Sequence, residues 1–247
     1  MKAEQSLFAA DSITRKLHSD PAMAVGGIRA LLQQALHPEA MAGVANNSNF
    51  REDTWGRLRR TGDYVALLTF GPIVQAESMA ARVRAIHTKL GLDDPHLLLW
   101  VHMAMVDSFL DVAVRSGLAL EPAERDTYVL EMRTFANLVG INSDSVPTTV
   151  REMQSYFAEI SPELVASEDA KRAAIFLTFP PMSKSLRFGT PAAPAWTSLA
   201  ALATASLPVW ARKLYNLPNL PGHEVATNIA LRATRSTLGL IPESVFA

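Results

Sequence analysis

Apolar residues recur at helical spacing along most of the chain, and the alternation typical of strands is scarce. The clearest helix is predicted over residues 73–90, where one apolar stripe is formed by Ala76, Met79, Ala80, Val83 and Leu90. Gly91 follows this stripe and is predicted to end the helix. His87 lies on the same stripe, four residues after Val83.

A second helix is predicted from Pro95 to about Ser116, with Asp94 as its cap and the proline in its first turn. It is apolar on nearly every side, which predicts a central position in the fold. Its apolar run HLLLWVHMAMV is interrupted by Asp107 and is too short to cross a membrane. The run carries His102 on an apolar helix face.

Proline and glycine divide the rest of the chain into further helices, with breaks at His37-Pro38 and at Gly71-Pro72. One helix is predicted to end at Gly140, and about four more are expected after Pro162. No internal repeat and no low-complexity linker is visible. We therefore predict an all-α fold with a single domain over residues 1–247.

The segment 188–211 contains no charged residue and is rich in alanine, serine and threonine. Its prolines leave room for one helix between Pro194 and Pro208. We interpret this helix as buried or as lining a groove. Contact with a membrane surface is the alternative, and a true membrane span is the third interpretation.

Composition narrows the function classes for this chain of 247 residues. Apolar residues make up 49% and charged residues 19%, which is typical of a globular protein with a large core. The net charge of −1 gives no overall field that would favour nucleic acid or an anionic membrane. The absence of cysteine excludes disulfides, thiolate nucleophiles, iron–sulfur clusters and thiolate-ligated haem. The first residues lack the apolar stretch of a signal peptide, so a cytoplasmic location is expected.

Against this near-zero charge, Arg57, Arg59 and Arg60 cluster just before Thr61. In a helix, Arg57 and Thr61 share one face, Arg60 flanks that face, and Arg59 points elsewhere. Two guanidinium groups and a hydroxyl suit an anionic ligand, or an oxygen species bound in a dry pocket. A solvated basic surface is the alternative interpretation.

Asp107 and Asp111 form a pair at helical spacing on the predicted central helix. The two carboxylates could accept hydrogen bonds from the arginine cluster, or they could mark the solvated face of their helix.

The chain lacks a phosphate-binding loop, an HExxH motif and a GxSxG elbow, so its six histidines are the main candidates for chemistry. Three near helix ends are predicted to face solvent: His18, His96 and His223. His37 is predicted to form a structural hydrogen bond to a neighbouring helix end. His87 and His102 lie on apolar faces, where each could be a hydrogen-bonded core histidine or a haem ligand. A haem-ligating histidine gives one nitrogen to iron and one N–H to an acceptor.

The order of several motifs resembles the haem-dependent oxygenase family that includes the latex-clearing rubber oxygenases and the fungal mycophenolate-pathway oxygenase. The motifs span about residues 20–155, and they are GGIRALLQQALHPEAMAGVANNSNF, DTWGRLRRTGDYVALLTFG, ARVRAIHTKLG, DDPHLLLWVHMAMVDSFL and AERDTYVLEMRTFANLVG. LPVWARKLYNLP is similar to the C-terminal part of the family. The resemblance implies a globin-like helical core around a b-type haem.

The resemblance also implies a role for each candidate residue. His87 would be the iron ligand, and His102 would be a pocket residue or the second candidate ligand. Arg57, Arg60 and Thr61 would be the catalytic residues, at the positions where rubber oxygenases have Arg, Lys and Thr. The implied activity is a haem-b-dependent oxygenase that uses dioxygen on a hydrophobic substrate such as an alkene or isoprenoid.

The pocket for such a substrate is expected from the segment LLLWVHMAMV together with the helix WTSLAALATASL. The alternatives are a non-catalytic haem-binding or apolar-ligand-binding protein of the same fold, and a helical interaction module without haem.

The chain departs from the rubber oxygenases in two respects. Arg60 stands where they have a lysine that can bind iron, and arginine stays protonated and is a poor ligand. The carboxylate proposed as their general base has no aligned counterpart here. Cleavage of polyisoprene is therefore not inferred from the resemblance.

Overall fold

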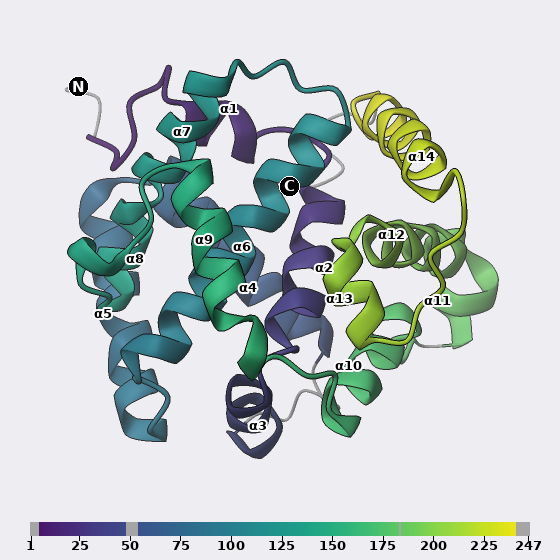
Figure 1. Ribbon diagram of the computed structural model, residues 1–247, viewed down its shortest axis with the longest axis horizontal. Helices are drawn as coiled ribbons and strands as arrows, with labels where there is room; N and C mark the ends of the chain where they lie inside the picture. The colour runs from purple at the N-terminus through teal and green to yellow at the C-terminus, as the bar shows by residue number, and fades with distance from the viewer. Residues whose placement is uncertain (1–4, 48–53, 183, 241–247) are drawn as a thin grey trace.

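The computed structural model describes residues 5–47, 54–182 and 184–240 and, as predicted, is all-α (Figure 1). Within these ranges there is no β-strand, and one isolated bridge pairs Ser6 with Pro72. The helical elements are α1 (Ile13–His18), α2 (Met23–Gln34), α3 (Pro38–Asn47), α4 (Thr54–Phe70), α5 (Ile73–Leu90), α6 (Pro95–Arg115), α7 (Pro122–Glu131), α8 (Arg133–Val139), η1 (Ser143–Ser145), α9 (Val150–Ile160), η2 (Ser161–Glu163), α10 (Glu168–Thr178), α11 (Lys184–Gly189), α12 (Ala192–Ser206), α13 (Val209–Leu214) and α14 (His223–Leu238).

Helix α6 occupies the centre of the molecule, as its apolar composition predicted. The Asp94 carboxylate accepts hydrogen bonds from the backbone N–H groups of His96 (2.8 Å) and Leu97 (3.4 Å), and this cap fixes the start of the helix. Most of its side chains are buried, and its main packing partner is α2. Residues on opposite faces of α6 therefore reach two different parts of the core.

Two apolar clusters share α6. One contains its Met103 together with Tyr128 and Phe135 from α7 and α8. The other contains its Trp100 together with Leu207 and residues of α2, α12 and α13. Because both clusters include side chains of one helix, packing on its two sides is coupled. The globin-like arrangement and the single-domain organisation stay predictions.

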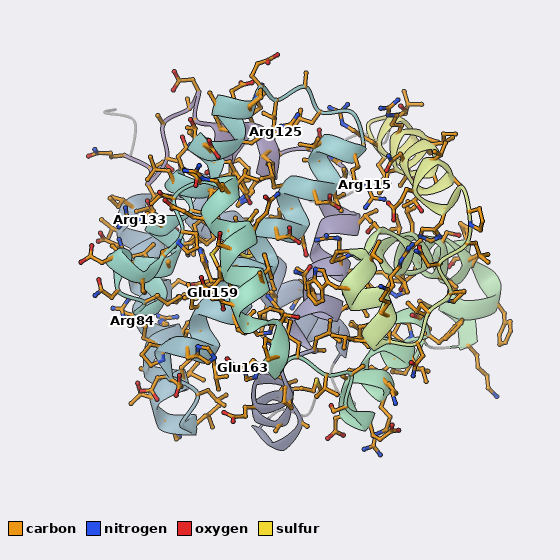
Figure 2. The ribbon with its side chains drawn as sticks, viewed as in Figure 1. Arg84, Arg115, Arg125, Arg133, Glu159 and Glu163 are labelled. Atoms are coloured by element: carbon orange, nitrogen blue, oxygen red, sulfur yellow. The ribbon has the colours of Figure 1, made fainter. Side chains whose placement is uncertain are left out.

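A buried arginine crosses the interface between α2 and α6. Arg29 donates hydrogen bonds to the Asp107 carboxylate (2.9 Å) and the Ser108 hydroxyl (2.8 Å), and its other terminal nitrogen lies 3.4 Å from Asp111. Asp111 also pairs with Arg115 (Figure 2), and Arg115 in turn pairs with Glu224 of α14. The two aspartates thus hold neighbouring helices, a role that neither interpretation of this pair included.

The uncharged segment 188–211 folds as the end of α11, all of α12 and the start of α13. Helix α12 lies between its flanking prolines and buries Ala200, Ala203 and Ser206, mainly against α2. The helix therefore packs one face on the fold, while its other residues are half-buried or exposed. Of the described helices, α6 alone is long and apolar enough to cross a membrane, but most of it is covered by the fold. Core helices commonly meet the same criteria, so this is weak support for a span.

Candidate functional site

An apolar pocket of about 280 Å³ is lined by residues of α2, α3, α4, α5, α6 and α10. Its apolar wall includes Leu31, Met41, Leu98, Val101, Ala173 and Phe176. Three polar side chains join this wall, and they are Gln34, Thr61 and His87. An apolar cavity with a few polar groups is the usual form of a small-molecule site.

His87 enters the pocket wall from the last turn of α5. The helix ends at Gly91, which adopts the left-handed conformation (φ 66°), and the His87 carbonyl accepts the Leu92 N–H at 2.9 Å. Nδ1 of its ring is covered and has no hydrogen-bond partner within the described part of the chain. Burial lowers the pKa of His87, and the nearby Asp93 carboxylate opposes this only in part. The ring is therefore neutral near pH 7 and keeps a lone pair for a ligand.

Thr61 lines the same pocket from α4, together with Leu58 one turn earlier, and is itself exposed to solvent. The structure thus brings into one pocket wall two residues to which the family resemblance gives a role, Thr61 and His87. Arg60 is exposed and does not line the pocket. Arg57 belongs to α4, one turn before Thr61, but its side chain lies outside the described residues. Of the three residues predicted to share one helix face, Thr61 is the one whose described side chain lines the pocket.

His102 lies behind the pocket wall. It follows the pocket residue Val101 on α6 but is not a pocket residue itself. It is 5% exposed, and its Nε2 atom has no partner among the residues that the structure describes. Burial lowers its pKa to about 4, so the ring is neutral. This placement favours His87 over His102 as the residue that a pocket ligand would contact.

The pocket wall differs from the predicted one in one helix. Leu97, Leu98 and Val101 of the expected apolar run do line it. Helix α12, the segment WTSLAALATASL, contributes no lining residue, and α10 contributes instead. Trp196 of α12 donates a hydrogen bond to the Leu177 carbonyl at 2.7 Å, so α12 supports α10 from behind. The expectation that α12 lines the pocket is corrected accordingly.

One histidine predicted to face solvent is half-buried and packs against the core. His18 places Nδ1 2.8 Å from the Thr69 hydroxyl and Nε2 3.1 Å from the Tyr128 hydroxyl. Burial lowers its pKa to about 3. Its partners lie far away in the sequence, so no local pattern could have identified this role.

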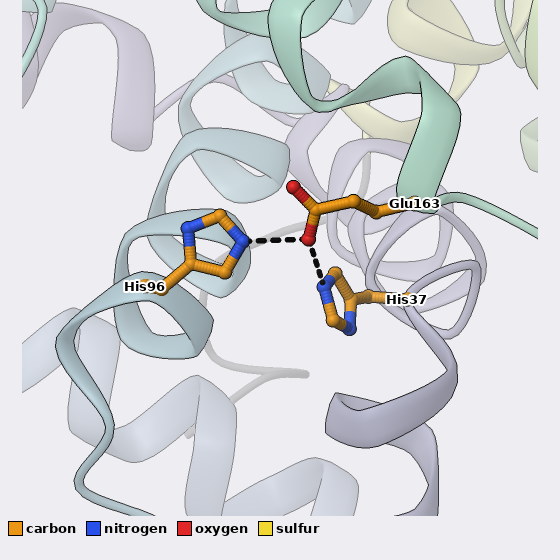
Figure 3. A group of neighbouring side chains, drawn as sticks. All are labelled: His37, His96 and Glu163. Carbon is orange, nitrogen blue, oxygen red and sulfur yellow. Dashed lines mark hydrogen bonds and ion pairs between the residues drawn. The ribbon is translucent and has the colours of Figure 1, made fainter.

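A second polar cluster lies outside the pocket wall (Figure 3). Nε2 of His37 lies 3.3 Å from Oε2 of Glu163, and Nε2 of His96 lies 2.8 Å from the same oxygen. The predicted hydrogen bond from His37 to a neighbouring helix end is confirmed, because Glu163 ends η2. His96 is exposed, as predicted. Hydrogen bonds from His96 and then His37 hold the pKa of Glu163 below its ordinary value. Glu163 was not singled out by sequence, because only the fold brings it to the two rings.

Comparison with known proteins identifies the family to which the chain belongs. A family model described as ER-bound oxygenase mpaB/B'/Rubber oxygenase, catalytic domain, matches residues 15–239. No curated protein and no solved structure matches the chain significantly. The matched segment contains every pocket residue named above. The chain therefore belongs to the oxygenase family of mpaB/B' and rubber oxygenase catalytic domains.

Proposed function

We propose that this protein is a haem-b-dependent oxygenase that acts with dioxygen on a hydrophobic small molecule bound in the apolar pocket. One observation carries the proposal: His87 of α5 and Thr61 of α4 lie in the wall of one pocket. The family resemblance implies His87 as the iron ligand and Thr61 as one of the catalytic residues.

The chemistry of the pocket fits a haem. A neutral imidazole is a common iron ligand, and burial keeps His87 neutral. Its Nδ1 is covered and has no acceptor among the described residues, so we propose Nε2 as the nitrogen that serves the pocket, without the N–H acceptor that a ligating histidine usually has. The mostly apolar wall suits a large aromatic macrocycle. The volume of about 280 Å³ lies just below the range of small-molecule sites, roughly 300–1,000 Å³, so haem can bind only if the walls move outward.

When bound, haem supplies the redox chemistry that activates dioxygen, and the protein supplies position and polarity. The Thr61 hydroxyl can donate a hydrogen bond within the pocket and orient dioxygen there. The apolar wall holds the substrate, and because Thr61 is exposed to solvent, the strength of that hydrogen bond depends on how far the bound substrate covers it. We propose Arg57, one helical turn from Thr61, as a second donor. Arg60 is exposed and permanently charged, so it does not serve as an iron ligand.

The same pocket also supports the alternative function, which is binding of haem or another apolar ligand without catalysis. Its wall is almost entirely apolar, and such a surface binds an apolar molecule whether or not a reaction follows. Turnover distinguishes the two functions.

The test supplies the haem-loaded protein with isotopically labelled dioxygen, a reductant and a panel of alkene and isoprenoid lipids. We expect oxygenated products that carry the label. Replacing Thr61 with valine removes the hydroxyl but keeps the shape, and should lower turnover about 100-fold at unchanged haem content. The matched control is Thr88→Val, because Thr88 is exposed on α5 and does not line the pocket. Full haem loading with no labelled product would favour the non-catalytic alternative.

A further inference from the structure

Three side chains from separate segments converge outside the pocket wall (Figure 3). His37 lies between α2 and α3, His96 lies in the first turn of α6, and Glu163 ends η2. One potential ligand atom from each lies within 4.8 Å of the other two. We propose that His37, His96 and Glu163 form a binding site for a divalent transition metal ion of the zinc type.

The donor set determines the class of metal. Two imidazole nitrogens and one carboxylate oxygen suit zinc and neighbouring first-row ions, whereas magnesium and calcium prefer oxygen ligands throughout. In a tetrahedral zinc site with bonds of about 2.0 Å, neighbouring ligand atoms lie about 3.3 Å apart. The two nitrogen–oxygen distances here are 3.3 and 2.8 Å. Small movements of the side chains therefore suffice to admit an ion.

The hydrogen bonds already present mark the positions of the ligand atoms. One oxygen of Glu163 faces a ring nitrogen of both histidines. A cation bound between these three atoms replaces the protons of the two hydrogen bonds. Nδ1 of His37 is covered and has no partner among the described residues, so no hydrogen bond there fixes the tautomer of the ring. His96 and Glu163 are about half exposed, which gives an ion access from solvent.

The backbone holds the three segments together without help from an ion. The Val165 N–H donates to the Leu36 carbonyl at 2.8 Å, next to Glu163 and His37. The Asp94 cap fixes the backbone of His96. A site whose segments are already positioned loses little conformational freedom when it binds a metal.

None of the three side chains lines the apolar pocket, but their chain neighbours do. Ala35 lies two residues before His37, and Leu97 directly follows His96. A metal at this site therefore links the segments of Ala35 and Leu97 from outside the pocket and does not contact the substrate. The site stands independently of the proposed haem.

The test uses the full chain without an affinity tag, stripped of metal with a chelator. Calorimetric titration with zinc should show one equivalent of zinc bound per chain. Cobalt should give visible absorption bands that zinc removes, which reports direct ligation. His96→Ala and Glu163→Gln should each weaken zinc binding by more than about tenfold, the loss that even outer ligand partners can cause. Both side chains are partly exposed, so the fold should tolerate these changes.

Matched controls separate this site from others. Glu159→Gln removes the same charge one turn earlier on α9 (Figure 2), and His223→Ala removes a histidine on α14. Both controls should bind zinc like the unchanged protein, and so should His87→Ala. The proposal is overturned if zinc shows no saturable binding, or if His96→Ala and Glu163→Gln bind zinc as tightly as the controls do. Loss of binding in His87→Ala alone would also overturn it, because that result places zinc in the pocket. Circular dichroism checks that each variant is folded. If His96→Ala does not fold, the zinc affinity of Glu163→Gln tests the proposal.

Discussion

Burial keeps the key histidine rings neutral. It lowers the pKa of His87, His102 and His18, and a neutral ring can offer a lone pair or accept a hydrogen bond. Position on an apolar helix face singled out His87 and His102 as candidates in the sequence, and their role as ligands stays a prediction. His18 was missed because its partners, Thr69 and Tyr128, are brought to it only by the packing of α4 and α7 on α1.

These buried rings should make stability depend on pH. The pKa of His102 is about 4 and that of His18 about 3, whereas an ordinary histidine titrates near 6.5. Between pH 6.5 and about 4 the unfolded chain binds protons that the folded chain does not, so the free energy of unfolding falls as the pH falls. The slope should approach about 1.4 kcal/mol per pH unit for each ring.

Urea unfolding measured from pH 7.5 to 5 checks this dependence. The variant His102→Leu removes one titrating ring and should make the slope shallower. Thr88→Val changes an exposed position without removing a titrating group, so it serves as the control and should leave the slope as it was. An unchanged slope in His102→Leu would contradict the role given to burial.

At the scale of elements, the ends of helices could be predicted where a capping residue or a glycine marks them. Which helices pack against each other could not be predicted in this way. Asp94 and Gly91 mark the boundaries of α6 and α5, and the structure places caps at both. The helix predicted to run to Gly140 is instead divided at Met132 into α7 and α8, where the sequence has neither proline nor glycine. Likewise, the lack of charge favoured α12 as the pocket wall, but the pocket is lined by α10, which carries Glu168, Asp169, Lys171 and Arg172 outside the lining.

The pocket wall makes a testable prediction about ligand access. Val101 of α6 lines the pocket and is 37% exposed, so a larger side chain can be accommodated by the fold at this position. Val101→Trp should fill part of the cavity and weaken binding of an apolar fluorescent probe by at least about tenfold, because the lost volume is a large share of about 280 Å³.

Probe titration against the control Val225→Trp measures this effect. Val225 lies on α14, is 64% exposed and does not line the pocket. Equal probe affinity in the two variants would mean that the apolar ligand binds elsewhere.

For the whole molecule, the decisive feature is that helices distant in sequence meet around one pocket. The all-α class and the central place of α6 followed from helical periodicity and apolar content alone. The meeting of Thr61 with His87 was expected only through the family resemblance, because spacing along the chain does not determine how α4 packs against α5. Neither the buried Arg29 nor the triad of His37, His96 and Glu163 had a local signal, since each depends on segments far apart in the chain.

The most direct test of the haem-binding proposal is the haem content of the purified protein after expression with haem supplied. The absorption spectrum and a pyridine haemochrome assay should show one haem b per chain for the unchanged protein and for the control His223→Ala. His87→Ala should lose the Soret band while keeping its helical circular dichroism. If His87→Ala retains the same haem content and the same spectrum, His87 does not hold the iron and the proposed site is wrong.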